Sequence, residues 1–134
     1  MSEENVELVR ERNEHFVATG EVEDDWFEPD FVWDMSTFKD WPEKREYLGV
    51  DGYRQFFSEW LEAWVDLRME LVDVRDGSGD RVVSVFQQYG KSKHTGLAVT
   101  MTFATVWTLR DDRYVRMQMY ATPEQAFEAV GLSE

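Results

Sequence analysis

The chain contains no cysteine and only two histidines, His15 and His94, which lie far apart. The absence of cysteine excludes disulfide bonds and thiolate chemistry, and the two histidines lack the spacing of a zinc site. The sequence also lacks an HExxH motif, a glycine-rich phosphate loop and a nucleophile elbow. We therefore expect no metal, no cofactor and no covalent catalysis.

Basic residues are scarce as well. The 134 residues include 14 Lys and Arg against 28 Asp and Glu, for a net charge of −14. Such a surface repels nucleic acid, whose binding depends on Lys and Arg that neutralise phosphates. No apolar run approaches the ~18 residues of a membrane span. The N-terminus lacks the basic start and apolar run of a signal peptide, so we expect a cytoplasmic protein without nucleic-acid or membrane partners.

Aromatic residues, in contrast, are abundant. Six Trp, nine Phe and five Tyr make up 15% of the chain. This is more than a minimal core of one small domain requires. The excess predicts an aromatic-lined interior that retains some space.

Hydrophobic periodicity predicts an α+β fold in a single domain, residues 1–134. A curved antiparallel sheet is expected to wrap around the N-terminal helices, because helices are followed by a run of hairpin-connected strands. The "FVWDMS" segment, 31–36, belongs to a first strand, and a loop centred on "WPEK" should follow over 37–50. Helices are expected over 3–18, 51–67 and 122–131, and the later strands over 67–75, 81–90, 94–110 and 113–121.

Three segments carry a family resemblance: "NEHFVATGEVEDDWFEPDFVWDMS", "YLGVDGYRQFFSEW" and "TVWTLRDDRYVRMQMYATPEQAFEAVGL". They resemble the nuclear transport factor 2-like superfamily, in its branch of ketosteroid isomerase-like and SnoaL-like polyketide cyclase proteins. The resemblance implies a cone-shaped, usually dimeric α+β fold. Members include isomerases, cyclases, dehydratases, epoxide hydrolases and non-catalytic binders, so the fold does not specify the reaction.

The catalytic pattern of the isomerases is not matched. The resemblance places a Tyr in the first helix, an Asp base in the first strand and a protonated Asp in a later strand. The aligned positions hold Asn13, Met35 and Thr105. The acid expected on the last strand of polyketide cyclases falls near Met119.

Asp34 is the carboxylate that decides between enzyme and binder. Side chains alternate along a strand, so Trp33 and Met35 share one face and Asp34 takes the other. If Trp33 faces the cavity, Asp34 is a non-catalytic acid on the outer face. A bulge would instead place it at the pocket mouth as a base, and pairing with Arg or Lys is a third alternative.

The main hypothesis is an apolar pocket for a small, flat or polycyclic molecule. Asn13 interrupts the apolar face of the first helix, so its amide either bonds internally or contacts the ligand. The expected lining is Asn13, Trp33, Met35, Trp60, Trp64, Gln87, Tyr89, Phe103, Thr105, Trp107, Met117 and Met119. In the simpler interpretation, the same side chains fill a solid core.

Two other classes of function stay open. An acid–base enzyme of the isomerase or cyclase type would need a titratable group beside the substrate, for which Asp34, His94 and Tyr89 are weak candidates. A dimeric interaction module without a ligand is the other. We expect a homodimer through the outer sheet face, with Arg116, Gln118, Tyr120 and the 102–108 row in the interface.

Overall fold

The computed structural model describes residues 2–38, 46–77 and 79–132. Within them lie three α-helices, one 3-10 turn and six strands. The helices are α1 (Ser2–Thr19), α2 (Gly49–Glu62) and α3 (Pro123–Ala129), and the 3-10 turn is η1 (Asp24–Trp26). The strands are β1 (Phe27–Asp34), β2 (Glu46–Leu48), β3 (Trp64–Asp76), β4 (Arg81–Ser92), β5 (Ala98–Arg110) and β6 (Arg113–Tyr120).

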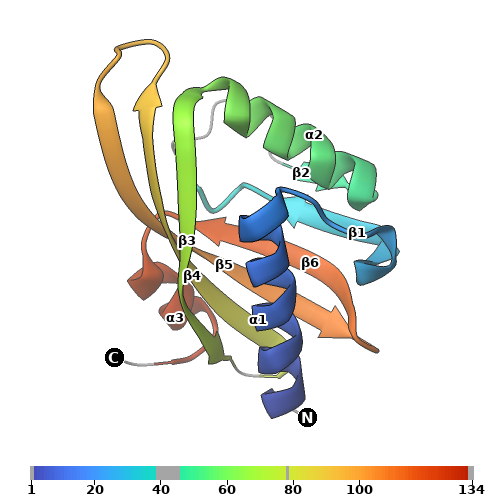
Figure 1. The fold of residues 1–134 in the computed structure, drawn as a ribbon. Coiled ribbons are helices and arrows are strands. Elements are labelled where there is room, and N and C mark those ends of the chain that lie inside the picture. Colours follow the sequence, from blue (N-terminus) through green and yellow to red (C-terminus); the bar gives the residue numbers. More distant parts are fainter. Residues whose placement is uncertain (1, 39–45, 78, 133–134) are drawn as a thin grey trace.

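The strands form one curved sheet in the order β2-β1-β6-β5-β4-β3 (Figure 1). Strands β3 to β6 pair antiparallel, as predicted. The sheet as a whole is mixed, however, because β1 pairs parallel with β6. Short β2, which pairs antiparallel with β1, lies inside the predicted loop. The "WPEK" centre of that loop lies outside the described residues.

Local sequence signals set most element ends. Gly20 follows α1 with a φ of 75°, and the Thr122 side chain caps α3 by accepting a hydrogen bond from the Gln125 amide (3.2 Å). Asp111 and Asp112, both with positive φ, form the two-residue turn between β5 and β6. Positive φ at both central residues gives the twist that a tight hairpin requires.

The end of α2 differs from the prediction. The sequence predicts a helix over 51–67, but α2 stops at Glu62 and β3 begins at Trp64. Trp64 pairs with Ser92, so β4 supplies the backbone partners that another helical turn would have provided. A distant strand therefore overrides the local helix preference.

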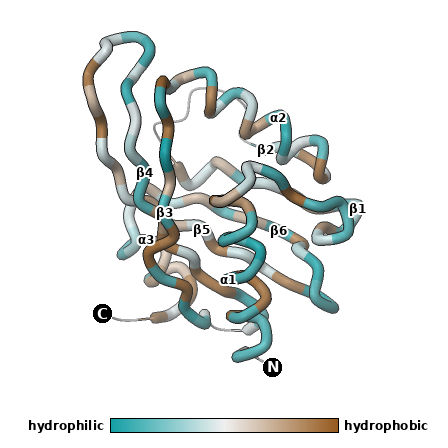
Figure 2. The backbone as a smooth tube through the Cα atoms, viewed as in Figure 1, coloured by the Kyte–Doolittle hydropathy of each residue, from teal (hydrophilic) through white to brown (hydrophobic). Residues whose placement is uncertain are grey.

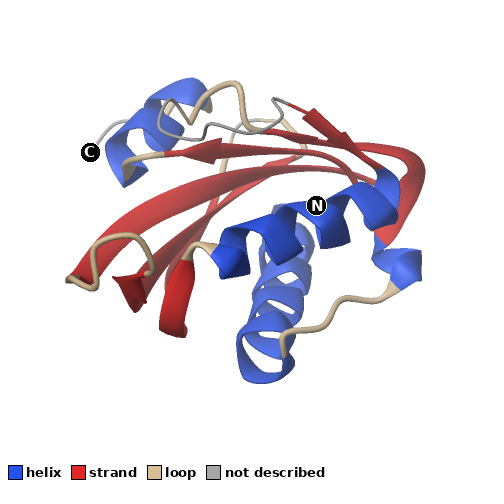
Figure 3. Cartoon of the chain, turned by 90° about the horizontal axis from the view of Figure 1, so that it is seen from above, coloured by secondary structure: helices blue, strands red, loops and turns tan. Residues whose placement is uncertain are grey.

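The helices lie on both sides of the sheet (Figure 3). Helices α1 and α2 pack on one face and enclose the main core with it. On the other face α3 packs with strands β4 and β5, and a second core forms from Val83, Val85, Ala104, Val106, Ala126, Phe127 and Val130. Part of the expected dimer surface, Ala104 and Val106, is thus buried within the chain by its own helix.

Close packing of α2 requires a glycine. A Cβ added at Gly52 would lie 2.8 Å from the carbonyl carbon of Tyr47 in β2. No side chain fits at that separation, so Gly52 permits α2 to lie directly against the sheet edge. Figure 2 shows α2 with apolar and polar residues alternating along its turns, as a helix with one buried face requires.

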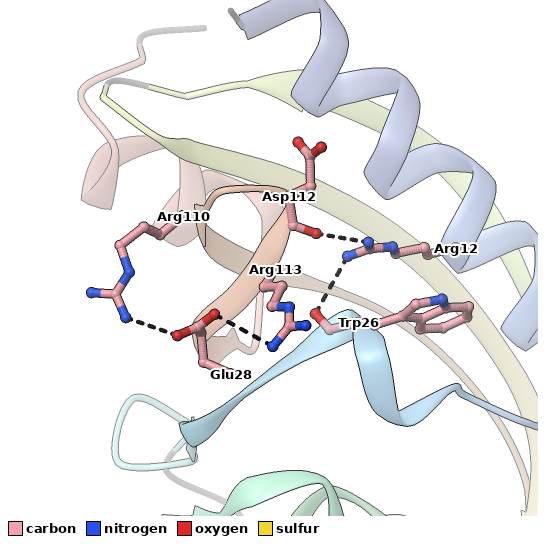
Figure 4. A network of polar contacts seen from close by, with 6 residues as sticks. All are labelled: Arg12, Trp26, Glu28, Arg110, Asp112 and Arg113. Carbon is pink, nitrogen blue, oxygen red and sulfur yellow. Dashed lines mark hydrogen bonds and ion pairs between the residues drawn. The ribbon is translucent and has the colours of Figure 1, made fainter.

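A polar network holds α1 against the sheet (Figure 4). The Arg12 guanidinium donates to the Asp112 carbonyl (2.7 Å) and lies over the rings of Trp26 and Tyr114. Nearby, Glu28 accepts a hydrogen bond from Arg110 (3.0 Å). These contacts fix the end of the sheet beside α1.

Among the described residues, none of the helices has the length and hydrophobicity that a membrane-spanning helix needs.

Candidate functional site

A small cavity of about 30 Å³ lies between α1, α2 and the sheet. A volume of this size holds one or two water molecules. Its walls are mostly aromatic. They consist of Asn13, Phe16, Trp33, Tyr53, Phe56, Phe57, Trp60, Met69, Phe86, Phe103, Thr105, Trp107 and Met119.

Strand pairing places the sheet residues of the cavity wall. Trp33 of β1 and Trp107 of β5 both pair with Met117 of β6, so the three form one row across the sheet. The next row contains Thr105, paired with both Met119 and Ser84. Residues two apart on a strand share a face, which brings Thr105 and Trp107 to the same wall.

Helix α2 supplies the opposite wall. Phe56 stacks on Trp60 (5.8 Å between ring centroids) and lies 4.5 Å from the Trp33 ring. Trp33 also contacts Tyr53 (4.7 Å) and Trp107 (6.0 Å), both edge to face. These ring contacts fill most of the interior. The expected aromatic interior is present, and the free space within it is small.

The buried polar atoms of the lining residues fall into two groups. In the first group, the Ser84 hydroxyl donates to the Asn13 carbonyl oxygen, and the Trp60 indole N–H donates to Gln88 Oε1 (2.8 Å). The second group consists of Trp33 Nε1, Trp107 Nε1 and Thr105 Oγ1, which are buried and find no hydrogen-bond partner among the described residues. Buried polar atoms usually have a partner, which makes this second group unusual.

The described lining contains no Asp, Glu, His, Lys or Arg. Tyr53 is its one ionisable residue, and burial raises the pKa of its hydroxyl well above the usual value. The hydroxyl therefore stays protonated at neutral pH. The described wall thus has no group that would act as a general base there.

Asp34 is buried on the face of β1 opposite Trp33 and does not line the cavity. It accepts hydrogen bonds from the Ser36 amide (2.9 Å) and from Arg116 Nη2 (2.5 Å). Burial raises the pKa of Asp34, but the hydrogen bonds from Ser36 and the contact with Arg116 outweigh it and lower the pKa below 3.8. Asp34 is ionised and paired with Arg116, one of the alternatives left open by the sequence.

Gln87 and Tyr89, expected in the pocket, lie on the other face of the sheet. The inward positions of β4 are instead Ser84, Phe86 and Gln88. Tyr89 donates to Glu70 (3.3 Å) on the outer face. The prediction was off by one residue, which exchanges the two faces of a strand.

His94 is exposed in the connection between β4 and β5, away from the cavity. Met35, Trp64 and Met117 are also absent from the described lining. Met35 and Met117 belong to the core, and Trp64 packs beside Trp60 (6.2 Å).

Several lining residues were not among those expected from the sequence: Phe16, Tyr53, Phe56, Phe57, Met69 and Phe86. Phe16, Phe56 and Phe57 lie in the helices predicted at 3–18 and 51–67, where they recur at helical spacing with other apolar residues, and this signal could have identified them. For Met69 and Phe86, the sequence did not show which face of β3 and β4 is directed towards the cavity. Pairing across the sheet decided this orientation.

A surface groove of about 420 Å³ lies beside the cavity. Phe16, Tyr53 and Phe57 line both spaces, whereas Leu61, Arg54 and Val22 line only the groove. The three shared rings contact one another, with Phe16 and Phe57 at 4.5 Å between centroids. They form an aromatic wall between the groove and the cavity.

The model of the SnoaL-like domain matches residues 9–117 of the chain. The chain belongs to the SnoaL-like family. This confirms the resemblance and the fold class expected from the sequence. A search of curated proteins finds no match to this SnoaL-like protein.

Solved structures share the fold over nearly the whole length. TerC, co-crystallised with polyporic acid, has a TM-score of 0.68 at 21% identity, covering 94% of this chain and 96% of TerC. A candidate SnoaL-like polyketide cyclase from Jannaschia sp. has a TM-score of 0.69 at 21% identity, covering 99% and 95%. A nuclear transport factor 2-like protein of unknown function from Burkholderia pseudomallei has a TM-score of 0.68 at 18% identity, covering 95% and 97%.

Of the positions aligned with the isomerase pattern, Asn13 and Thr105 line the cavity of this SnoaL-like protein, and Met35 is buried in the adjoining core. Met119, at the position of the polyketide cyclase acid, also lines the cavity. The resemblance therefore indicated positions that lie in the protein interior, although the residues at these positions differ from the catalytic patterns.

Proposed function

We propose that this SnoaL-like protein binds a small, flat, apolar molecule between α2 and the sheet. The observation that carries the proposal is the cavity wall, which is mostly aromatic and without charge among the described residues. Apolar cavities with a few polar groups are the usual design of small-molecule sites. The structure of TerC co-crystallised with polyporic acid supports a binding role for this fold.

A ligand of several rings needs more space than the present cavity of about 30 Å³. The aromatic wall of Phe16, Tyr53 and Phe57 is where that space would open. Phe16 and Phe57 are only half-buried and border the groove of about 420 Å³. Rotation of these two rings towards the groove would join the two spaces and admit a ligand from the surface.

An acid–base reaction is less well supported. It requires a titratable group within about 3 Å of the substrate proton. The sequence candidates Asp34, His94 and Tyr89 all lie outside the described lining. A carboxylate held in an ion pair with Arg116 is a weak base, since its pKa is lowered.

A panel of polycyclic aromatic compounds tests the proposal by two signals, intrinsic tryptophan fluorescence and melting temperature. A bound compound should change both, and at about one hundred times its Kd it should stabilise the fold by ~2.7 kcal/mol. Trp107→Ala should abolish both responses, whereas Trp26→Ala, which removes an indole outside the cavity, should retain them. A panel that moves neither signal in the wild type would contradict the proposal.

A further inference from the structure

The hairpin of β4 and β5 ends in a basic surface on an otherwise acidic protein. The segment 81–110, which forms both strands, contains no Asp or Glu, although the chain has 28 of them. Lys91, Lys93 and His94 are exposed at the end of this hairpin, which extends beyond the rest of the sheet (Figure 1). A chain with a net charge of −14 repels other acidic surfaces, but the end of this hairpin attracts them.

Exposed apolar side chains accompany these cations. Leu97 is 66% exposed. Val65 of β3, whose register partner in β4 is Lys91, is 41% exposed. Lys91 pairs on its other side with Ala98, the neighbour of Leu97, so the apolar residues and the lysine lie together. Grouped exposed apolar residues are typical of an interaction surface. We call this surface the basic tip; it consists of Val65, Lys91, Lys93, His94 and Leu97.

Backbone hydrogen bonds hold the basic tip in one shape. The Ser92 amide donates to the Leu97 carbonyl (3.0 Å), and the Gly96 amide donates to the Ser92 carbonyl (2.8 Å). The Lys93 amide donates to the carbonyl of Ala63, just after α2 (3.1 Å). A surface that is ordered before binding loses little conformational entropy when a partner docks. The basic tip is therefore preorganised for contact.

A surface of opposite charge lies beside α1. A groove of about 340 Å³ is lined by Leu8, Glu11, His15, Glu23, Asp25 and Trp26, together with Arg12. Three carboxylates against one guanidinium leave this acidic groove negative, and Leu8 and Trp26 give it an apolar part. The acidic groove therefore matches the basic tip in both charge and apolar character.

The basic tip and the acidic groove lie at opposite ends of the molecule. Arg12, in the groove, donates to the Asp112 carbonyl, which follows the last residue of β5. The basic tip precedes the first residue of the same strand, Ala98. Because β5 has 13 residues that each advance ~3.3 Å, the two surfaces are roughly 40 Å apart. One molecule cannot dock its own tip in its own groove, but a second copy can.

We infer that the basic tip of one copy docks in the acidic groove of another, with Lys91 and Lys93 beside the groove carboxylates and Leu97 against Trp26. Such a head-to-tail contact leaves one tip and one groove unoccupied, so it extends into open chains. It requires neither a bound ligand nor pairing through the outer face of the sheet. At 0.15 M salt, charges more than ~8 Å apart are largely screened, which reduces the repulsion between the two acidic bodies more than the attraction at the contact.

Sedimentation velocity at 0.15 M salt, over a concentration series from micromolar to millimolar, tests this inference. The wild type should form species larger than a dimer as the concentration rises. Lys91→Glu/Lys93→Glu should weaken this association at least about tenfold, because it places acids against acids. Glu11→Lys/Asp25→Lys should do the same by placing bases against bases. All four side chains are exposed, so both variants should keep the wild-type fold and melting behaviour.

Mixing the two charge-reversed variants is the decisive measurement. The acidic tip of one variant then meets the basic groove of the other, and association should return. Both variants keep a net negative charge, so overall attraction between them does not explain this rescue. A mixture that stays unassociated would overturn the inference, as would a wild type without species larger than a dimer.

A neutral substitution tests the apolar part of the contact. Leu97→Ser should weaken the association several-fold without changing the charge. Val72→Ser is the matched control, since Val72 is 56% exposed on β3 but belongs to neither surface, and it should associate like the wild type. Equal association of Leu97→Ser and wild type, or equal losses in Leu97→Ser and Val72→Ser, would refute docking through the tip.

Discussion

Asp34→Asn should destabilise the fold and leave ligand binding nearly unchanged. The Asp34 carboxylate accepts two hydrogen bonds, one from the Ser36 amide and one from the Arg116 guanidinium. Asparagine retains an oxygen for Ser36 but loses the charge that attracts Arg116. A hydrogen bond to a charged group contributes about 1.5–3 kcal/mol. The Arg116 side chain is 39% exposed and regains water in the variant, so we expect a smaller loss, about 1–2 kcal/mol.

The pH dependence gives a second signature. Because the folded-state pKa of Asp34 lies below its ordinary value of 3.8, its contribution is fully present above the unfolded-state pKa. It disappears as the pH falls through the folded-state pKa. The stability difference between wild type and Asp34→Asn should therefore be constant from about pH 5 to 8 and shrink below about pH 4.

Urea denaturation at pH 7 and at pH 3 to 4 measures this difference directly. For a chain of this size the loss corresponds to a fall of roughly 3–8 °C in melting temperature. Asp30→Asn, an exposed carboxylate on the same strand, is the control and should change stability by less than about 0.5 kcal/mol. Equal stability of wild type and Asp34→Asn at pH 7 would refute this account of Asp34. Loss of ligand affinity in a well-folded Asp34→Asn would restore the enzyme hypothesis.

Three further predictions concern entry, turn geometry and assembly. Phe57→Ala should accelerate ligand association, measured by stopped-flow fluorescence, whereas Leu61→Ala, which changes only the groove, should not; equal rates would argue against entry past Phe57. Asp112→Gly should raise the free energy of unfolding by about 0.5–1 kcal/mol, because glycine adopts the observed φ of 65° without strain. Chemical denaturation would show it, and a loss of stability would contradict the turn assignment. Finally, we propose that the outer face around Gln118 pairs two copies, and sedimentation at micromolar concentration should give a dimer that Gln118→Arg weakens; a clean wild-type monomer would refute it.

Much of the local structure could be predicted from the sequence. The alternation in "MTFATVW" correctly placed Phe103, Thr105 and Trp107 on one face, because strand side chains alternate whatever the partner strand. Thr122 and Gly131 marked the ends of the last helix through capping chemistry that involves only neighbouring residues. The resemblance, which covered most of the chain, correctly indicated the family and the curved fold.

Strand β4 shows where pattern alone fails. Its "VVSVFQQYG" segment is apolar at both inward and outward positions, because α1 and α2 cover one face and α3 covers the other. The usual contrast between a buried and a solvated face is absent. Hydrophobicity therefore could not decide whether Gln87 or Gln88 points inward, and the prediction chose the wrong one.

The chemistry of the site was decided by contacts between distant segments. Ser84 donates to Asn13, 71 residues away, and Arg116 pairs with Asp34, 82 residues away. The sequence determined that Asp34 and Trp33 point to opposite faces, since neighbours on a strand must. Only the parallel pairing of β1 with β6 brought Arg116 to Asp34 and aligned Trp33 with Trp107 across Met117. Register between strands is set by packing of the whole sheet, and no single segment contains that information.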